Sequence, residues 1–462
     1  MSGKAGVMSI PVHVRLAWLL GVIACGGGTS NLTMDAPSDA TSDATPMGDA
    51  PLDAFDPSSR VEIKVFKEDG SGDLATTAIA VFRNQADQVI QAGPVDANAV
   101  AFAFMPTGGS VTVHYVLDNP LDLSQRDHQI TTIRGVKPGD RLQAGILRSH
   151  EYRVGAQTGM TATFTPFPSS STPYLLSSCG GTSIGTSNTV SMSFLASCVT
   201  PTFDLLTVHD GNDLIRRYVW QTGVVYASGG AFTIPNTWQP IAHNATTILN
   251  VPPGLTRVFG TLFAVVGGKP LELERQPIEA PAAGTHMMSL MHAPGAGSST
   301  IVTVGLTSGF SVPETHVQVT TGSAANMTID LGALPLPKLG TAGTGGISVS
   351  WSQTGPASGD ARLIRWYGNW TDSNSIRHSA AWHIVEAPDA STTSVLPPFP
   401  VAYAADDPTL VGGFSTLGAV VQYVDYDNLA DYDAARPYGY QLYLVEERFP
   451  EVAHHAHASR SR

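Results

Sequence analysis

The sequence predicts an all-β protein made of tandem β-sandwich modules. Three observations support this fold class. Gly and Pro are abundant, at 46 and 32 of 462 residues, while only 14% of the residues are charged. Short segments in which apolar and polar residues alternate recur along the chain. Turn-forming residues separate these segments, and the combination favours many short strands over long amphipathic helices.

The length and the charge of the chain limit its organisation and its partners. The chain has room for roughly three or four domains of ~100 to 150 residues each. Its formal net charge is −13 at pH 7. We expect no nucleic-acid partner, because binding to phosphate requires clustered Lys and Arg side chains.

The first residues have the parts of a secretory signal. Lys4 and Arg15 form a basic front, and an apolar run follows at 16–24. This run is too short to span a bilayer, which takes ~20 apolar residues, so we expect it to be cleaved. Because the front is long, translation from Met8 instead of Met1 is an alternative.

The end of this segment resembles the bacterial lipobox. Val22, Ile23 and Ala24 precede Cys25, and in a lipobox a small residue precedes a cysteine that is lipidated before cleavage. The resemblance implies that the signal peptide 1–24 is cut between Ala24 and Cys25, and that lipid on Cys25 anchors the protein to a membrane. By similarity to enteric sorting rules, the absence of Asp after Cys25 implies the outer membrane, on its periplasmic or cell-surface face. An ordinary signal peptide with an incidental Cys25 is the alternative.

The other two cysteines are predicted to form a disulfide. Cys179 and Cys198 lie in one Gly/Ser-rich stretch, and an exported protein enters an oxidising compartment. Closing a loop of this size would contribute about 3 kcal/mol. Two separate buried thiols are the alternative.

Residues 25–59 are predicted to be a disordered acidic linker that begins with the lipidated cysteine. Residues 29–59 contain no Lys or Arg, and Asp-Ala pairs recur there among Pro, Ser and Thr. Such a stretch cannot bury enough apolar area to offset its ordering entropy. It is similar to the Asp-Ala-rich tethers of surface lipoproteins in certain Gram-negative bacteria.

A first β-sandwich module is predicted at 60–147. Strands are expected at 61–65, 79–82, 102–104 and 111–115, where apolar residues recur with the period of a strand and Gly/Pro turns intervene. The order of strand, Asp-Gly turn, strand and Pro-x-Gly turn resembles the carboxypeptidase-regulatory-like and immunoglobulin-like modules of bacterial surface proteins. The resemblance implies a sandwich that spaces, stiffens or binds, without chemistry of its own.

Three further modules and a tail are expected. A β module with the cysteine pair is placed at 148–250 and another at 251–338. The last module, 339–450, begins with a strand in which Trp351 and its apolar neighbours alternate with serines, which resembles an early strand of a fibronectin-III-like module. Residues 451–462 are predicted to be a disordered tail.

Candidate ligand-binding aromatics lie in the last module. Trp366, Tyr367 and Trp370 are close in sequence, and Gly368 and Asn369 predict that Trp370 lies on a loop. Exposed aromatic side chains there could stack on a glycan or anchor a protein partner. Burial in a sandwich core is the alternative interpretation.

Two clusters are candidates for metal binding. His286, Met288 and His292 share one face of a predicted strand, and imidazole and thioether groups suit copper. Carboxylates downstream suit Ca²⁺, although the EF-hand spacing and its closing Glu are missing. The alternative interpretations are that Met288 is an ordinary core residue and that the acidic side chains are exposed to solvent. The carboxylates belong to Asp425, Asp427, Asp431 and Asp433.

No catalytic residue is predicted. Residues 181–185 match G-x-S-x-G, but no helix-forming sequence follows them, so we expect a plain loop. The predicted function is a non-catalytic, membrane-anchored lipoprotein without a cofactor, displaying its modules for adhesion, cell-envelope interaction or ligand capture. Calcium, copper or carbohydrate binding is the second hypothesis, and a hydrolase with dispersed active-site residues is the third.

Overall fold

The computed structural model describes most of the chain after residue 56. The predicted signal peptide 1–24, the linker as far as residue 56, and Cys25, Cys179 and Cys198 lie outside the described residues. The described ranges are 57–67, 73–118, 125–145, 157–164, 173–177, 183–184, 188–195, 201–210, 216–251, 253–266, 269–296, 299–307, 314–322, 326–331, 337–345, 347–355, 357–407, 415–426, 428–443 and 454–461.

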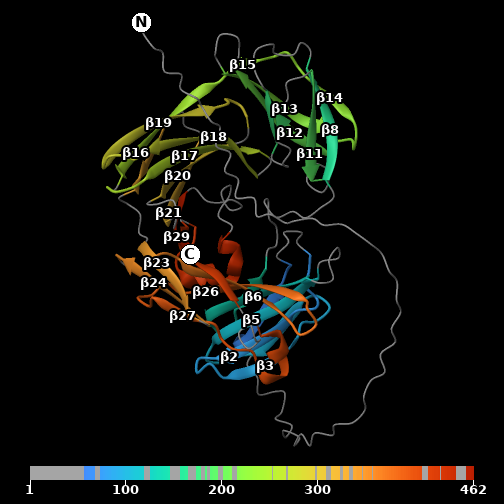
Figure 1. Cartoon of the computed structure of the whole chain (residues 1–462), viewed down its shortest axis with the longest axis vertical. Coiled ribbons are helices and arrows are strands. Elements are labelled where there is room, and N and C mark those ends of the chain that lie inside the picture. Colours follow the sequence, from blue (N-terminus) through green and yellow to red (C-terminus); the bar gives the residue numbers. More distant parts are fainter. Residues whose placement is uncertain are drawn as a thin grey trace, which may run out of the picture. The chain divides into compact units, whose positions relative to one another are not determined.

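The fold is all-β, as the sequence predicts, and strands form six sheets in the described ranges (Figure 1). The longest sheet has the order β18 (Lys269–Glu279), β17 (Arg257–Val266), β20 (Ser299–Thr307), β21 (Glu314–Gly322), β29 (His454–Ser461), β28 (Ser415–Tyr426), β25 (Ala361–Thr371), β26 (Arg377–Glu386), β6 (Gln125–Val136), β5 (Gly109–Asp118), β2 (Ile79–Asn84), β3 (Val89–Pro94).

The other sheets are shorter. Their strand orders are β4 (Val100–Phe104), β1 (Arg60–Val65), β7 (Arg141–Ala144); β10 (Ser183–Ile184), β9 (Tyr174–Ser177), β12 (Thr202–Asp210), β13 (Arg216–Val225), β15 (Gln239–Pro240); β11 (Thr189–Leu195), β8 (Gln157–Phe164), β14 (Ala231–Ile234); β19 (Gly284–His292), β16 (Ala242–Val251), β22 (Asn326–Asp330); and β23 (Lys338–Gly345), β24 (Ser348–Thr354), β27 (Thr393–Val395).

The helical segments in the described residues are short. They are the 3₁₀ helices η2 (Pro57–Ser59), η4 (Val401–Asp406) and η5 (Arg436–Tyr443) and one α-helical turn, α1 (Tyr432–Ala435). In the part of the chain that the structure describes, no helix is long and apolar enough to cross a membrane.

The strands expected in the first module are present. Along β1, Val61, Ile63 and Val65 are fully buried while the residues between them are exposed or half-buried, which is the predicted alternation. The expected Pro-x-Gly turn joins β4 to β5, and its Gly108 has φ +71, where an added Cβ would clash with the carbonyl oxygen of Val136. A glycine is therefore required at this turn.

One hydrophobic core connects the first and last predicted modules. It contains residues of β1, β2, β5 and β6 together with Leu363, Val385 and Val424 from β25, β26 and β28. β26 also pairs in parallel with β6, with Ile384 opposite Thr132. Segments far apart in the sequence thus share both a sheet and a core, in which burial of each large apolar side chain contributes about 1.5–3 kcal/mol.

A neighbouring core lies on β25, β26 and β28 and is covered by the β23-β24-β27 sheet. Trp366 and Trp382, a direct cross-strand pair, are both fully buried in it. The region 157–331 has two further cores, one between the β8 and β12 sheets and one that involves β12, β16, β17 and β19.

Pro57–Ser59, at the end of the expected disordered linker, form η2, and the Met105 amide donates to the Ser59 carbonyl at 2.8 Å. Two further segments expected to lack regular structure form strands. Ser183 and Ile184, expected in a loop, form β10, which pairs with β9. His454–Ser461 of the expected tail form β29, which pairs with β21 and β28. In both places, ladder hydrogen bonds satisfy backbone groups of segments whose composition alone indicates no structure.

Candidate functional site

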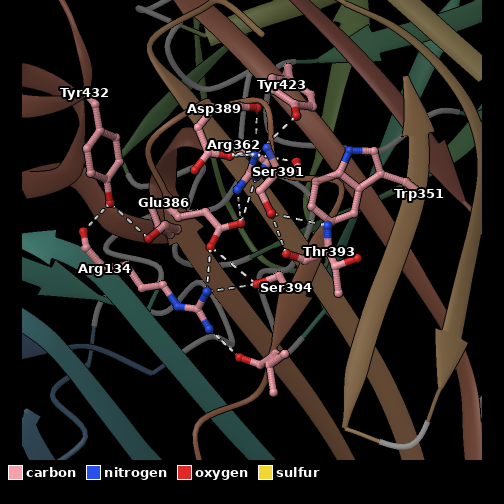
Figure 2. Close-up of polar contacts among 12 residues, drawn as sticks. Arg134, Trp351, Arg362, Glu386, Asp389, Ser391, Thr393, Ser394, Tyr423 and Tyr432 are labelled. Carbon is pink, nitrogen blue, oxygen red and sulfur yellow. Dashed lines mark hydrogen bonds and ion pairs between the residues drawn. The ribbon is translucent and has the colours of Figure 1, made fainter. Parts of the chain in front are cut away.

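A buried ion-pair network links β25, β26 and β6 (Figure 2). Arg362 of β25 lies directly opposite Glu386 of β26 in the strand register. The Arg362 Nε donates to Glu386 Oε1 at 2.8 Å, and its Nη2 lies 2.7 Å from the same oxygen. The two side chains are only 3% and 7% exposed. We call Arg134, Arg362, Glu386 and Asp389 the arginine cluster.

The Arg362 guanidinium also holds the loop after β26. Its Nη1 donates to Asp389 Oδ1 at 2.7 Å and to the Ser391 carbonyl at 3.1 Å, and its Cζ lies 4.9 Å from the Trp351 ring centroid. Burial, the largest single influence, opposes its charge, but the charge of Glu386 and the hydrogen bonds to Tyr423 and Asp389 together outweigh burial and raise the pKa of Arg362. Burial would raise the pKa of Asp389, whereas the hydrogen bond from Arg362 lowers it, with the net shift downward.

Arg134 of β6 shares the same carboxylate. Its Nη1 donates to Glu386 Oε2 at 2.9 Å and to Ser394 Oγ at 3.1 Å. The Tyr432 hydroxyl donates to the carbonyl of Arg134 at 2.6 Å, and burial raises the pKa of Tyr432. Two cations thus enclose one buried anion, and removal of Arg362 would leave Glu386 with Arg134 alone, whose side chain is 33% exposed.

Three buried histidines form a second polar feature, which we call the histidine row. His114 Nε2 lies 3.0 Å from His128 Nδ1, and His128 Nε2 lies 2.9 Å from His378 Nδ1. The residues come from the adjacent strands β5, β6 and β26, and each is at most 8% exposed. Trp370 stacks on His378 with a centroid distance of 4.7 Å. The Asp372 carboxylate is 3.5 Å from His378 Nε2.

Two members of the histidine row, His114 and His128, are uncharged at neutral pH. Burial lowers the pKa of His114 to about 4. Burial, followed by repulsion from His114, His378 and Arg126, lowers the pKa of His128 to about 3. In each contact between two of these rings, one nitrogen carries the N–H donor and the other nitrogen accepts the hydrogen bond.

The predicted aromatic site is not on an exposed loop. Trp366 is fully buried, Trp370 is 6% exposed, and both lie within β25. Tyr367 is half-buried, with the Arg365 guanidinium 4.7 Å from its ring centroid. The expectation of a loop at Gly368 is wrong because this residue pairs with the neighbouring strand in the sheet ladder.

The predicted copper ligands are not brought together. His286 and His292 lie near opposite ends of β19, and six residues of an antiparallel strand span ~20 Å. Two imidazoles bound to one ion each lie ~2 Å from it. Met288, 5% exposed, packs in a hydrophobic core, and His286 Nε2 contacts the Ala282 carbonyl at 2.7 Å.

Two of the predicted calcium ligands have other partners. Asp431 caps α1 by accepting from the Ala434 amide at 3.1 Å. Asp433 pairs with Lys137 and Arg436, and their hydrogen bonds lower the pKa of its carboxyl. Asp425 is half-buried in β28, and Asp427 lies outside the described residues. Within the described ranges, no group of three or more His, Cys, Asp or Glu side chains is placed to hold a metal ion.

Comparisons with known proteins show little similarity. No family model matches the chain, and no curated protein matches it. Among solved structures, the chain is similar to the native conformation of E. coli alpha-2-macroglobulin at 8% sequence identity and a TM-score of 0.10. That match covers 76% of this chain but only 26% of the macroglobulin chain, so the chain spans about a quarter of that protein's length.

Proposed function

We propose that the protein is a lipid-anchored, non-catalytic display protein of the outer membrane whose β-sandwich modules contact cell-envelope or external ligands. Lipid on Cys25 and the acidic linker 25–59 would hold the β body away from the membrane. The supporting geometry is the arginine cluster. Its charged groups bind one another and the loop after β26, as in a structural clamp, which suits a body whose role is to hold its shape.

Lipidation and display can be tested together in cells. Cells are fed a labelled fatty acid, and wild type is compared with Cys25→Ala. Label on wild type alone, with the β body removed by protease added to intact cells, is the expected result. An unlabelled wild-type protein would contradict the anchor, and a labelled body that resists protease would place it on the periplasmic face.

The non-catalytic part of the proposal has its own test. The purified full-length chain is treated with activity-based probes for serine hydrolases, and no labelling is expected. Labelling that is lost on Ser183→Ala would instead support the hydrolase hypothesis, because Ser183 is the serine of the G-x-S-x-G match.

A further inference from the structure

The outer face of the β4-β1-β7 sheet carries cations and aromatic rings. Phe104, Phe102 and Val100 on β4 lie opposite Arg60, Glu62 and Lys64 on β1, and Arg141 on β7 lies opposite Glu62. Their neighbours on the inner face, such as Val61 and Ile63, are buried in the core. We call this surface, made by Arg60, Lys64, Arg141, Phe102 and Phe104, the cationic face.

Its aromatic part is partly exposed and already contacts a cation. Phe102 is 41% exposed and packs edge-to-face with Phe104 at a centroid distance of 6.1 Å. The Arg60 Cζ lies 4.1 Å from the Phe102 ring centroid. The guanidinium thus lies over one face of the Phe102 ring, so a ligand that packs against the exposed part of the ring would also meet a positive charge.

The charge of this face is opposite to that of the whole chain. The net charge of the protein is −13, whereas the cationic face has three cations around one carboxylate. That carboxylate, on Glu62, pairs with Arg60 at 3.0 Å. Because this surface is positive in a chain that is negative overall, an anionic partner would favour it over other surfaces.

The cationic face also lies at the edge of its sheet. In the described residues, β4 is the last strand of its sheet and β3 is the last strand of the longest sheet. A cavity of about 210 Å³ lies between these edges, and Phe102, Gln91 and Asp96 are among its lining residues. The aromatic surface is therefore continuous with a recess that has hydrogen-bonding groups.

We propose that the cationic face binds an acidic polysaccharide, with a sugar ring against Phe102 and its anionic substituents at Arg60 and Lys64. Along β1, Arg60 and Lys64 are separated by ~13 Å, which suits a linear chain with repeated charges. Gln91 and Asp96 can bond sugar hydroxyls in the recess. This inference rests on the proposed display function and specifies its ligand class.

The test uses the full-length chain carrying Cys25→Ala, so that no lipid contributes. Calorimetry measures its affinity for a carboxylated polysaccharide, for a neutral polysaccharide of equal length and for vesicles with anionic lipid. We expect binding to the carboxylated polymer alone, weakened by salt. The double variant Arg60→Gln with Lys64→Gln should bind the carboxylated polymer about tenfold more weakly. Phe102→Ser should weaken this binding by the same factor while it retains the wild-type melting temperature.

Arg275→Gln with Arg377→Gln is the matched control, because it removes two exposed cations elsewhere and changes the net charge equally. This control should retain wild-type affinity. Equal loss in both double variants, absence of binding to the carboxylated polymer, or equal binding to vesicles would each overturn the proposal. Fatty-acid labelling and protease exposure in cells are independent of all three results, so the display function can fail or stand separately.

Discussion

Mild acid is expected to destabilise the fold through the histidine row. The pKa values of His114 and His128 are about 4 and about 3 in the folded protein, against 6.5 for a free imidazole. At pH values between the folded pKa and 6.5, the unfolded chain therefore binds more protons than the folded protein does. Stability is consequently lost as the pH falls below 6.5. At pH 5 each histidine should lower the free energy of unfolding by about 2 kcal/mol relative to pH 7.5, or about 4 kcal/mol together.

Urea unfolding at pH 7.5 and pH 5.0, followed by tryptophan fluorescence, measures this difference. His114→Gln keeps a side-chain donor near His128 but removes one titrating group, so its loss between the two pH values should be about 2 kcal/mol smaller than that of wild type. His243→Gln is the control, because His243 is exposed in the folded protein, and it should lose as much as wild type. An unchanged loss in His114→Gln would refute the reasoning.

Three further predictions concern stability. Arg362→Ala should cost about 3–5 kcal/mol in urea unfolding, because it leaves Glu386 buried without its main partner; a cost below 1 kcal/mol would show that the cluster is solvated. Trp366→Ala should cost about 3–5 kcal/mol in the same assay, and a near-neutral effect would contradict its burial. Thiol titration of the denatured mature protein should find Cys179 and Cys198 unreactive until reduction, which should then lower stability by about 3 kcal/mol; two reactive thiols at the outset would exclude the disulfide.

The sequence predicts the fold class and the first strands well because alternation at 61–65 directly reports one buried face. It does not predict the environment of Trp370. Gly368 and Asn369 indicate a turn by composition, but they pair with Ala380 and Ser379 in the sheet. Tertiary pairing outweighs local preference there, as is common for strands.

The polar clusters could not be predicted for a different reason. His114, His128 and His378 become neighbours only through the register of β5, β6 and β26, and a shift of one residue would turn a whole strand to the other face. Arg362 and Glu386 likewise meet only through the pairing of β25 with β26. The alternation of apolar residues along a strand shows which of its faces is buried, but it does not show which other strand pairs with it.

The parallel pairing of β6 with β26 also affects how the chain can reach its native state. The hydrogen bond from Trp382 Nε1 to Thr132 Oγ1 joins residues 250 positions apart. Contacts of such high sequence separation form late, because a long loop must close before they do. Until residues 377–386 emerge during synthesis, β6 has an open edge and its core lacks one side, so a truncated chain would be prone to aggregation. Quality control in the producing cell should therefore act on incomplete chains, and successful maturation depends on the last quarter of the sequence.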